Sequence, residues 1–158
     1  MAKVSQRQVL ARIAPNALSA TLPKWEGFLF AQVSGGELTA SVEKIYEGGA
    51  TSPTVLCAPF DIGDITLTAH YDDDRVATDG KTGIASKIAQ LREFVGKGYY
   101  DLYVETYNCD LKIPGLDRVY SKSLLVGLTE PDGDSSSGAP STFALTFSVS
   151  SVTSKASV

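Results

Sequence analysis

Few residues of this chain are suited to acid–base or nucleophilic chemistry. His70 is the single histidine, and the two cysteines, Cys57 and Cys109, lie well apart from it in the sequence. Any Ser/His/Asp or Cys/His arrangement would have to use His70. The alternation of its segment places His70 on the polar face of a strand, with Thr66 and Thr68. A small hydrolase built on Cys57 or His70 is therefore a weak interpretation.

The acidic clusters do not resemble metal sites. Asp72-Asp73-Asp74 and Asp132-Gly133-Asp134 lack the alternating ligands, central glycine and final glutamate of a calcium loop. The cysteines and histidine match no zinc spacing. The pairs Gly35-Gly36 and Gly48-Gly49 lack the strand–glycine–helix context of a nucleotide loop and read as turn glycines. We expect no catalytic residue, no cofactor and no metal.

Charge is distributed unevenly along the 158 residues. The whole chain carries a formal charge of −4, and its sequence pI is near 4.9, which argues against a protein that grips nucleic acid. Residues 1–24 contain four basic and no acidic side chains, so residues 25–158 carry −8. A basic arm on an acidic body would attract another copy, with Lys3, Arg7 and Arg12 as candidate contacts. The alternative is an ordinary solvated terminus.

Length and hydropathy fit one soluble domain. Apolar residues make up 43% of the chain, and no run is long enough for a membrane-spanning helix. No secretory signal is expected at the start. We divide the chain into a basic N-terminal arm (1–24), a single β-domain (25–152) and a C-terminal extension (153–158).

Strand patterns dominate that domain. Gly35-Gly36 lies between two apolar runs and predicts a two-residue hairpin turn. Further alternating segments predict strands at 64–71, 99–108, 122–128 and 142–150.

One amphipathic helix is expected within this β-rich pattern. Ile84, Ile88, Leu91 and Val95 share one helical face, which predicts a helix over about 80–96 that ends at Gly96. The fold class is therefore mainly β, an antiparallel β-sandwich or barrel with one flanking α-helix.

A long, apolar loop is expected over residues 48–62. It is rich in glycine and proline, yet it also carries large apolar side chains. A loop of this length in a small domain is usually functional or disordered. Its apolar side chains must be covered by the chain's own core or by a neighbouring copy. The residues that define it are Gly48, Gly49, Val55, Leu56 and Phe60.

Ordered short patterns over about residues 26–152 resemble the major tail protein of bacteriophages, the tail tube subunit. The opening part is Phe28-Leu29-Phe30 with Val33-Ser34-Gly35-Gly36-Glu37 and then Val42 to Gly49. The middle part is Ile65-Thr66-Leu67-Thr68 with Tyr71-Asp72 before a helix. The closing part is Tyr120 to Ser150, including Leu124 to Pro131 and Phe143 to Phe147.

The resemblance implies a structural virion protein with a tail-tube-like fold. Six subunits would form a ring, and rings would stack into the hollow tube of a long, non-contractile tail through which genomic DNA passes. Residues 47–62 and the terminal arms would join successive rings. The other implied partners are tail terminator and tail tip or baseplate proteins, with the tape measure protein and DNA transiently inside. The location would be the virion tail, assembled in the host cytoplasm.

An acidic lumen would repel DNA phosphates, whereas a basic one would bind them. The candidate lumen-facing acids, chosen because they stand on predicted strands, are Glu37, Glu43, Asp64, Asp101 and Glu105.

The main alternative is a monomeric or trimeric β-sandwich binding module, such as an adhesin or a receptor-binding virion protein. Tyr99, Tyr103 and Tyr107 would suit a sugar-binding platform. The oligomeric state separates the two functions, because only the tube subunit would be sixfold.

Overall fold

The structure is a computed structural model that describes residues 9–19, 21–25, 29–49, 51–71, 84–107, 118–131, 133 and 135–154. Eleven strands, one α-helix and one short 3-10 helix are present in these residues. They are β1 (Val9–Pro15), η2 (Ala17–Ser19), β2 (Gln32–Gly35), β3 (Leu38–Ala40), β4 (Glu43–Ile45), β5 (Thr54–Leu56), β6 (Phe60–Ile62), β7 (Ile65–His70), α1 (Ile84–Leu91), β8 (Tyr99–Thr106), β9 (Arg118–Thr129), β10 (Thr142–Ser148) and β11 (Thr153–Ser154).

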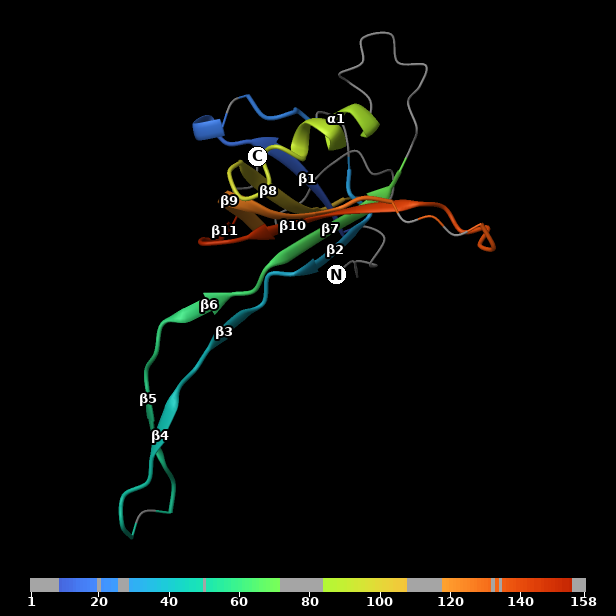
Figure 1. The fold of residues 1–158 in the computed structure, drawn as a ribbon. Helices are drawn as coiled ribbons and strands as arrows, with labels where there is room; N and C mark the ends of the chain where they lie inside the picture. Colours follow the sequence, from blue (N-terminus) through green and yellow to red (C-terminus); the bar gives the residue numbers. More distant parts are fainter. Residues whose placement is uncertain are drawn as a thin grey trace.

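The body is one antiparallel sheet that curls into a half-barrel (Figure 1). Its strand order is β1-β8-β9-β10-β7-β2, and β11 pairs with β9. The two ends of this order also meet at one point. There the N–H of Phe30 donates to the carbonyl of Ala11 at 2.8 Å, and the N–H of Ala11 donates back at 3.3 Å. The expected fold class, mainly antiparallel β with one flanking helix, is confirmed.

Period-two patterns correctly predicted strands at β7, β8, β9 and β10. Ile65, Leu67 and Ala69 of β7 are buried, as are Phe143, Leu145 and Phe147 of β10. These side chains form the core between the sheet and α1, together with an aromatic cluster. The centroid of the Trp25 ring lies 5.6 Å from that of Phe30 and 5.9 Å from that of Phe143.

Residues 9–25 contribute to the body, although residues 1–24 were predicted to form an arm outside the domain. β1 pairs with β8 from Val9↔Thr106 to Pro15↔Tyr100, and Leu10, Ala11 and Ile13 are buried. Residues 1–8, with Lys3 and Arg7, lie outside the described residues, as do residues 155–158.

The helix is shorter than its apolar pattern predicted. α1 ends at Leu91, and residues 92–97 form turns in which the N–H of Phe94 donates to the carbonyl of Leu91. Ile88 and Leu91 are buried, whereas Val95 is exposed, so the shared apolar face ends one turn early. Gly96 has φ of +82° and donates to the carbonyl of Leu125, so it belongs to the turn that leads into β8. Residues 80–83 are outside the described part.

Gly35-Gly36 does not form the predicted hairpin turn. β2 pairs with β7, and β3 pairs with β6, so the runs on either side of the glycines do not pair with each other. Both glycines have positive φ, +91° and +77°, as a hairpin turn would require. They use this conformation to bend the chain where it leaves the sheet.

Candidate assembly surface: a projecting hairpin

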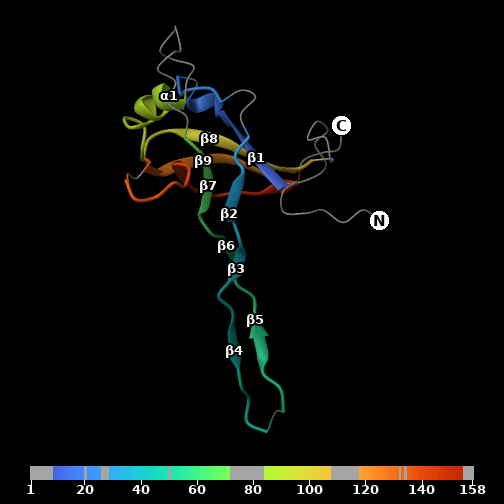
Figure 2. The same cartoon turned by 90° about the vertical axis from the view of Figure 1, so that its right-hand side faces the viewer.

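A long two-stranded ribbon projects from the body. We call residues 36–64 the projecting hairpin. β3 pairs with β6 from Leu38↔Ile62 to Ala40↔Phe60, and β4 pairs with β5 from Glu43↔Leu56 to Ile45↔Thr54. The hairpin runs away from the half-barrel in both views (Figures 1 and 2). The prediction of a loop at 48–62 is therefore wrong. Apart from the tip, this segment is the second strand of the projecting hairpin.

The projecting hairpin is apolar and exposed. Ten large hydrophobic side chains are exposed among the described residues, and seven belong to the hairpin. These seven are Leu38, Val42, Ile45, Tyr46, Val55, Leu56 and Phe60. An isolated two-stranded hairpin is at best marginally stable in water, and contiguous exposed apolar surface usually marks an interaction site. The hairpin is therefore suited to contact another molecule.

One face of the ribbon near the body is wholly apolar. Directly opposed residues of an antiparallel pair share a face, so Leu38, Ala40, Phe60 and Ile62 lie together. Leu38 and Phe60 are 57% and 61% exposed, whereas Ile62 packs partly against the core. This face leads from the edge of the core out to the solvent.

Three glycines lie at the junction between hairpin and sheet, and at Gly35 the close neighbour is backbone. A Cβ on Gly35 would lie 1.9 Å from the carbonyl oxygen of Asp64, and one on Gly36 would lie 2.9 Å from the Tyr120 hydroxyl oxygen. A Cβ on Gly63 would lie 2.5 Å from Oε1 of Glu37. Backbone hydrogen bonds clamp the same crossing, because Gly36 donates to Asp64 and Gly63 donates to Glu37. The direction of the hairpin is therefore set by close backbone packing.

The hairpin is also acidic. Residues 36–64 hold five acidic side chains and Lys44 as the sole base, a net charge of −4. Three of the five candidate lumen acids, Glu37, Glu43 and Asp64, stand on it and are exposed. Glu37 and Asp64 flank the junction, whereas Glu43 stands farther out on β4.

The other two candidate acids belong to β8 and are held by hydrogen bonds. Oδ1 of Asp101 accepts from Nδ2 of Asn16 at 2.8 Å and from the N–H of Lys122 at 3.0 Å. Glu105 is fully buried, and Nε of Arg12 donates to its Oε1 at 2.9 Å. The structure therefore does not gather the five acids into one cluster.

Arg12 is anchored within its own chain. Its guanidinium pairs with Glu105 and lies 4.1 Å from the centroid of the Tyr103 ring. Burial raises the pKa of the nearby Tyr107 hydroxyl, and the charge of Glu105 raises it further. Of the three candidate arm contacts, Arg12 is the one that the structure describes.

The described residues do not bring together a nucleophile and a base. His70 ends β7 and is exposed, and Cys57 is exposed on the projecting hairpin. Cys109, Asp72–Asp74, Asp132 and Asp134 lie outside the described residues. Within the described part, no three His, Cys, Asp or Glu side chains are placed to share a metal ion. No described helix is long and apolar enough to cross a membrane.

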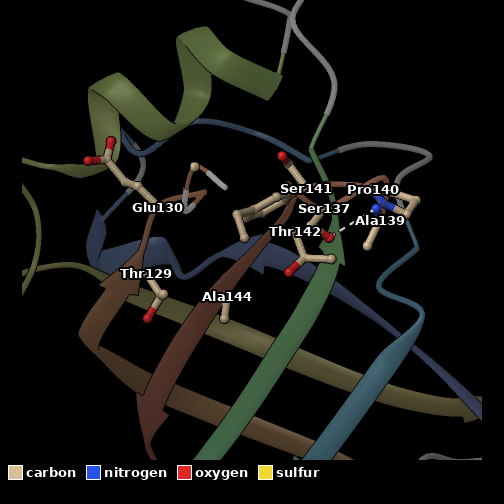
Figure 3. Close-up of a pocket in the computed structure, with 10 residues that line it drawn as sticks. Thr129, Glu130, Ser137, Ala139, Pro140, Ser141, Thr142 and Ala144 are labelled. Carbon is tan, nitrogen blue, oxygen red and sulfur yellow. Dashed lines mark hydrogen bonds between the residues drawn. The ribbon is translucent and has the colours of Figure 1, made fainter. Parts of the chain in front are cut away.

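A hollow of about 330 Å³ lies beside the turn between β9 and β10, and its lining mixes hydroxyl-bearing and apolar residues (Figure 3). The hydroxyl groups come from Thr129, Ser137, Ser141 and Thr142, and Glu130 supplies the one carboxylate among the described lining residues. Glu130 is paired with Arg92, whose Nε donates to it at 2.7 Å. Among the described lining residues, the one carboxylate is therefore held by an arginine.

Sequence reasoning found half of the projecting hairpin. Val55, Leu56 and Phe60 were singled out because they are apolar residues in a glycine- and proline-rich stretch. The exposure of Leu38, Val42, Ile45 and Tyr46 was not predicted, because the apolar run after Gly35-Gly36 was interpreted as the return strand of a hairpin. Five acidic residues against one base between Gly36 and Asp64 were the available signal that this segment is not a core hairpin.

Comparison with known proteins identifies the fold. Neither a protein-family model nor a curated protein matches the sequence. Among solved structures, a chain of the sheath–tube complex of an extracellular contractile injection system, PVC, matches at a TM-score of 0.70 and 13% identity, with 98% of this chain and 93% of that chain covered. A chain of the six-fold symmetrised baseplate of the anti-feeding prophage matches at 0.69 and 18% identity, with 98% and 96% covered.

A structure with a lower TM-score also matches over most of the chain. Hcp1 from Flavobacterium johnsoniae matches at a TM-score of 0.51 and 11% identity, with 93% of this chain and 94% of that chain covered. Identities at this level establish the fold alone. The chain has a tail-tube-like fold, which occurs in contractile injection systems and in Hcp proteins.

Proposed function

We propose that this chain is the structural subunit of the tube in a tail-like injection apparatus, and that six copies form a ring and rings stack into a hollow tube. The observation that carries this proposal is the projecting hairpin on a tail-tube-like half-barrel. An extended, apolar, acidic ribbon with no core of its own is suited to assembly and has no evident use in a monomer.

The half-barrel supports ring formation. β1 and β2 end the strand order, and a curled sheet with ends exposes backbone groups that can pair with another chain. Closure of several such sheets into one barrel removes these edges. The contact between Ala11 and Phe30 lies just before β2, and among the described strands β2 itself pairs with β7 alone. Neighbouring copies are the simplest source of the missing strands.

We assign the contacts between rings to the projecting hairpin, including Gly48, Gly49, Val55, Leu56 and Phe60, and to the N-terminal arm with Lys3 and Arg7. The chain's division into an arm (1–24), a domain (25–152) and a C-terminal extension (153–158) belongs to the same proposal, with the β1 part of the arm paired to the domain through β8. Arg12 would act by fixing β1 against β8.

The lumen and its cargo are the finer part of the proposal. The net charge of −8 over residues 25–158 favours a duct that repels phosphate, so passage of genomic DNA through a phage tail is one candidate. The structural neighbours come from contractile injection systems, which favours a contractile apparatus over the long non-contractile tail that the sequence resemblance implied. Terminator and baseplate proteins are the expected end partners, because matching chains occur in a tube-terminating cap and in a baseplate.

The test is assembly of the purified full chain. Concentrated protein, alone or with a nucleating baseplate complex, is expected to give sixfold rings or hollow tubes in negative-stain electron micrographs. A particle that stays monomeric or trimeric under all these conditions would overturn the proposal in favour of a binding module.

A further inference from the structure

The open face of the sheet lies on the side away from α1, because the buried side of α1 packs with the core on the other side. In β7 the buried side chains alternate with Thr66, Thr68 and His70, which therefore lie on the open face. Opposed residues of an antiparallel pair share a face, and the register pairs Gln32 of β2 with Thr68 and Ser34 with Thr66. These five residues form one continuous surface.

β10 adds four residues to this surface. Its buried side chains alternate with Thr142, Ala144, Thr146 and Ser148. The register with β7 places Thr146 opposite Thr66, and the hydroxyl oxygens of these two residues lie 3.4 Å apart. We call the nine residues on β2, β7 and β10 the hydroxyl face, because six of them are serine or threonine.

The hydroxyl face contains no aspartate, glutamate, lysine or arginine. Charged residues make up 20% of the whole chain, and the solvent-facing surface of a soluble domain is usually richer in charge than that. None of the ten large hydrophobic side chains that are exposed among the described residues belongs to this face. The face therefore lacks both the charged groups and the apolar anchors with which protein surfaces hold a partner.

Charge is present on neighbouring parts of the body. Asp101 and Glu105 of β8 lie on the open face of the sheet, where Asp101 accepts two hydrogen bonds and Glu105 pairs with Arg12. Glu37 and Asp64 lie at the junction with the projecting hairpin, outside β2 and β7. The hydroxyl face is therefore an uncharged area with charged residues on β8 and at the junction beside it.

In a tube of these subunits, the hydroxyl face belongs to the side of the sheet that can border the duct. α1 and η2 lie together on the other side of the sheet in both views (Figures 1 and 2). A sheet that closes into a barrel turns one face inward and the other outward. A side covered by a helix and its core would fill the interior, whereas seven of the nine residues of the hydroxyl face are serine, threonine or alanine.

From these observations we infer that the hydroxyl face forms the wall of the duct, and that this wall retains cargo of neither sign of charge. An acidic wall would hold the cationic groups of a passing macromolecule, and a basic wall would hold anionic groups such as phosphates. Hydroxyl groups offer neutral hydrogen bonds, which exchange with those of water at little net gain. The inference rests on the proposed tube function and refines it, because the acids that would repel phosphate lie off this wall.

The position of the hydroxyl face is tested with a single added cysteine. In a chain with Cys57→Ser and Cys109→Ser, Ser34→Cys places a thiol on the hydroxyl face and Gln90→Cys places one on α1. Both positions are exposed, so both unassembled chains should react with a small maleimide and with a maleimide on a large poly(ethylene glycol). In tubes, Gln90→Cys should react with both reagents, whereas Ser34→Cys should react with the small one alone.

The absence of charge selection is tested with Gln32→Glu and Gln32→Lys, which place one charge per subunit on the hydroxyl face. The matched controls are Gln90→Glu and Gln90→Lys, which make the same changes at an exposed glutamine of α1. Tubes are assembled with fluorescent oligolysine, oligoglutamate or Gly-Ser peptides of equal length, and the release of each peptide is followed after washing.

Wild-type tubes should release the three peptides with half-times that agree within about twofold, since neutral hydrogen bonds exchange with water at little net gain. Gln32→Glu should slow the release of oligolysine alone, and Gln32→Lys that of oligoglutamate alone, each by about three- to tenfold relative to the Gln90 controls. High salt should abolish both delays, because it screens the charges.

The outcomes separate the two proposals. If the wild-type chain forms neither rings nor tubes, the proposed function fails and the inference fails with it. If tubes form but their Ser34→Cys thiol reacts with the large reagent as readily as Gln90→Cys, the hydroxyl face lies outside the duct. Slow release of one charged peptide from wild-type tubes would show that the wall is charged. Equal effects of the charges at Gln32 and Gln90 would also overturn the inference.

Discussion

At the residue scale, the burial of Glu105 is the feature that sequence could least anticipate. Alternation correctly places Asp101 and Glu105 on the face of β8 opposite to the buried Leu102 and Val104. It does not reveal that Arg12, 93 residues away, pairs across β1 and β8 and covers the Glu105 carboxylate. The sequence shows that an acidic residue lies on a strand, but the burial of its side chain depends on which strand pairs alongside.

Arg12→Ala is expected to destabilise the fold by about 2 kcal/mol. It removes the ion-pair partner of the buried Glu105 carboxylate. The loss of stability is smaller than for a wholly buried pair, because the Arg12 side chain is 41% exposed. Urea unfolding measures the change. The matched control is Arg92→Ala, since the Arg92–Glu130 pair is exposed on both sides and should cost less than about 1 kcal/mol. Equal effects of the two variants would contradict this account of Glu105.

Tyr100 is expected to make the fold sensitive to alkali. Burial raises the pKa of its hydroxyl, which also donates to the carbonyl of Pro23 at 2.9 Å. The unfolded chain releases this proton near pH 10 while the folded chain keeps it, so the stabilisation is complete below about pH 10 and is lost as the pH rises further.

Above pH 10, the free energy of unfolding of the wild-type chain should fall by about 1.4 kcal/mol per pH unit because of Tyr100. This contribution of Tyr100 is measured as the difference between the wild-type and Tyr100→Phe chains in urea unfolding at pH 8 and at pH 10.5 to 11.5. Below pH 10, Tyr100→Phe should be the less stable chain by about 1 kcal/mol, because the Pro23 carbonyl loses its donor. A difference that does not change with pH would show that Tyr100 ionises normally.

At the element scale, β7, β8 and β10 could be predicted because each has one buried and one more open face. β1 was not predicted as a strand, because residues 1–24 were assigned to the arm. β7 and β10 show this alternation in full. The Gly35-Gly36 turn could not be predicted correctly, since a tight turn and a bend between two pairings require the same positive φ. The choice depends on β7, whose Ile65 pairs with Gly35 from 30 residues away. The helix was predicted too long for a related reason. The N–H of Gly96 donates to the carbonyl of Leu125 on β9 and does not continue the helix.

Gly35→Ala is expected to destabilise the chain strongly and to impair tube formation. The added Cβ meets a backbone oxygen, which cannot rotate away, in a residue that also has positive φ. The expected loss exceeds 2 kcal/mol in urea unfolding. Gly49→Ala is the matched control, because Gly49 has φ of +84° but no atom within 4 Å of an added Cβ. Gly49→Ala should lower the free energy of unfolding by about 1 kcal/mol and leave assembly intact. Similar effects at both positions would show that positive φ alone, and not the contact with the Asp64 carbonyl, makes Gly35→Ala destabilising.

At the scale of the whole molecule, the chain separates into a body that holds the core and a hairpin that holds most of the exposed apolar surface. The body buries Trp25, Phe30 and Phe143 against the sheet, whereas nearly every described residue between Glu37 and Asp61 is exposed. This separation explains why composition alone looked ordinary, since an average over both parts conceals a segment that is both apolar and acidic. It also means that stability and assembly should respond to different changes.

Replacing residues 41–59 by a short Gly-Ser turn between β3 and β6 is therefore expected to leave the body folded and to abolish stacking. The removed residues make few core contacts, so the melting temperature should fall by no more than about 3 °C. β3 and β6 stay in place, so Leu38↔Ile62 and the glycine junction are kept. Micrographs should show rings without tubes, and sedimentation velocity should show no species larger than a single ring. Tubes of normal length from this variant would show that the rings are joined elsewhere, whereas a collapse of the melting temperature would show that the outer half of the hairpin stabilises the body.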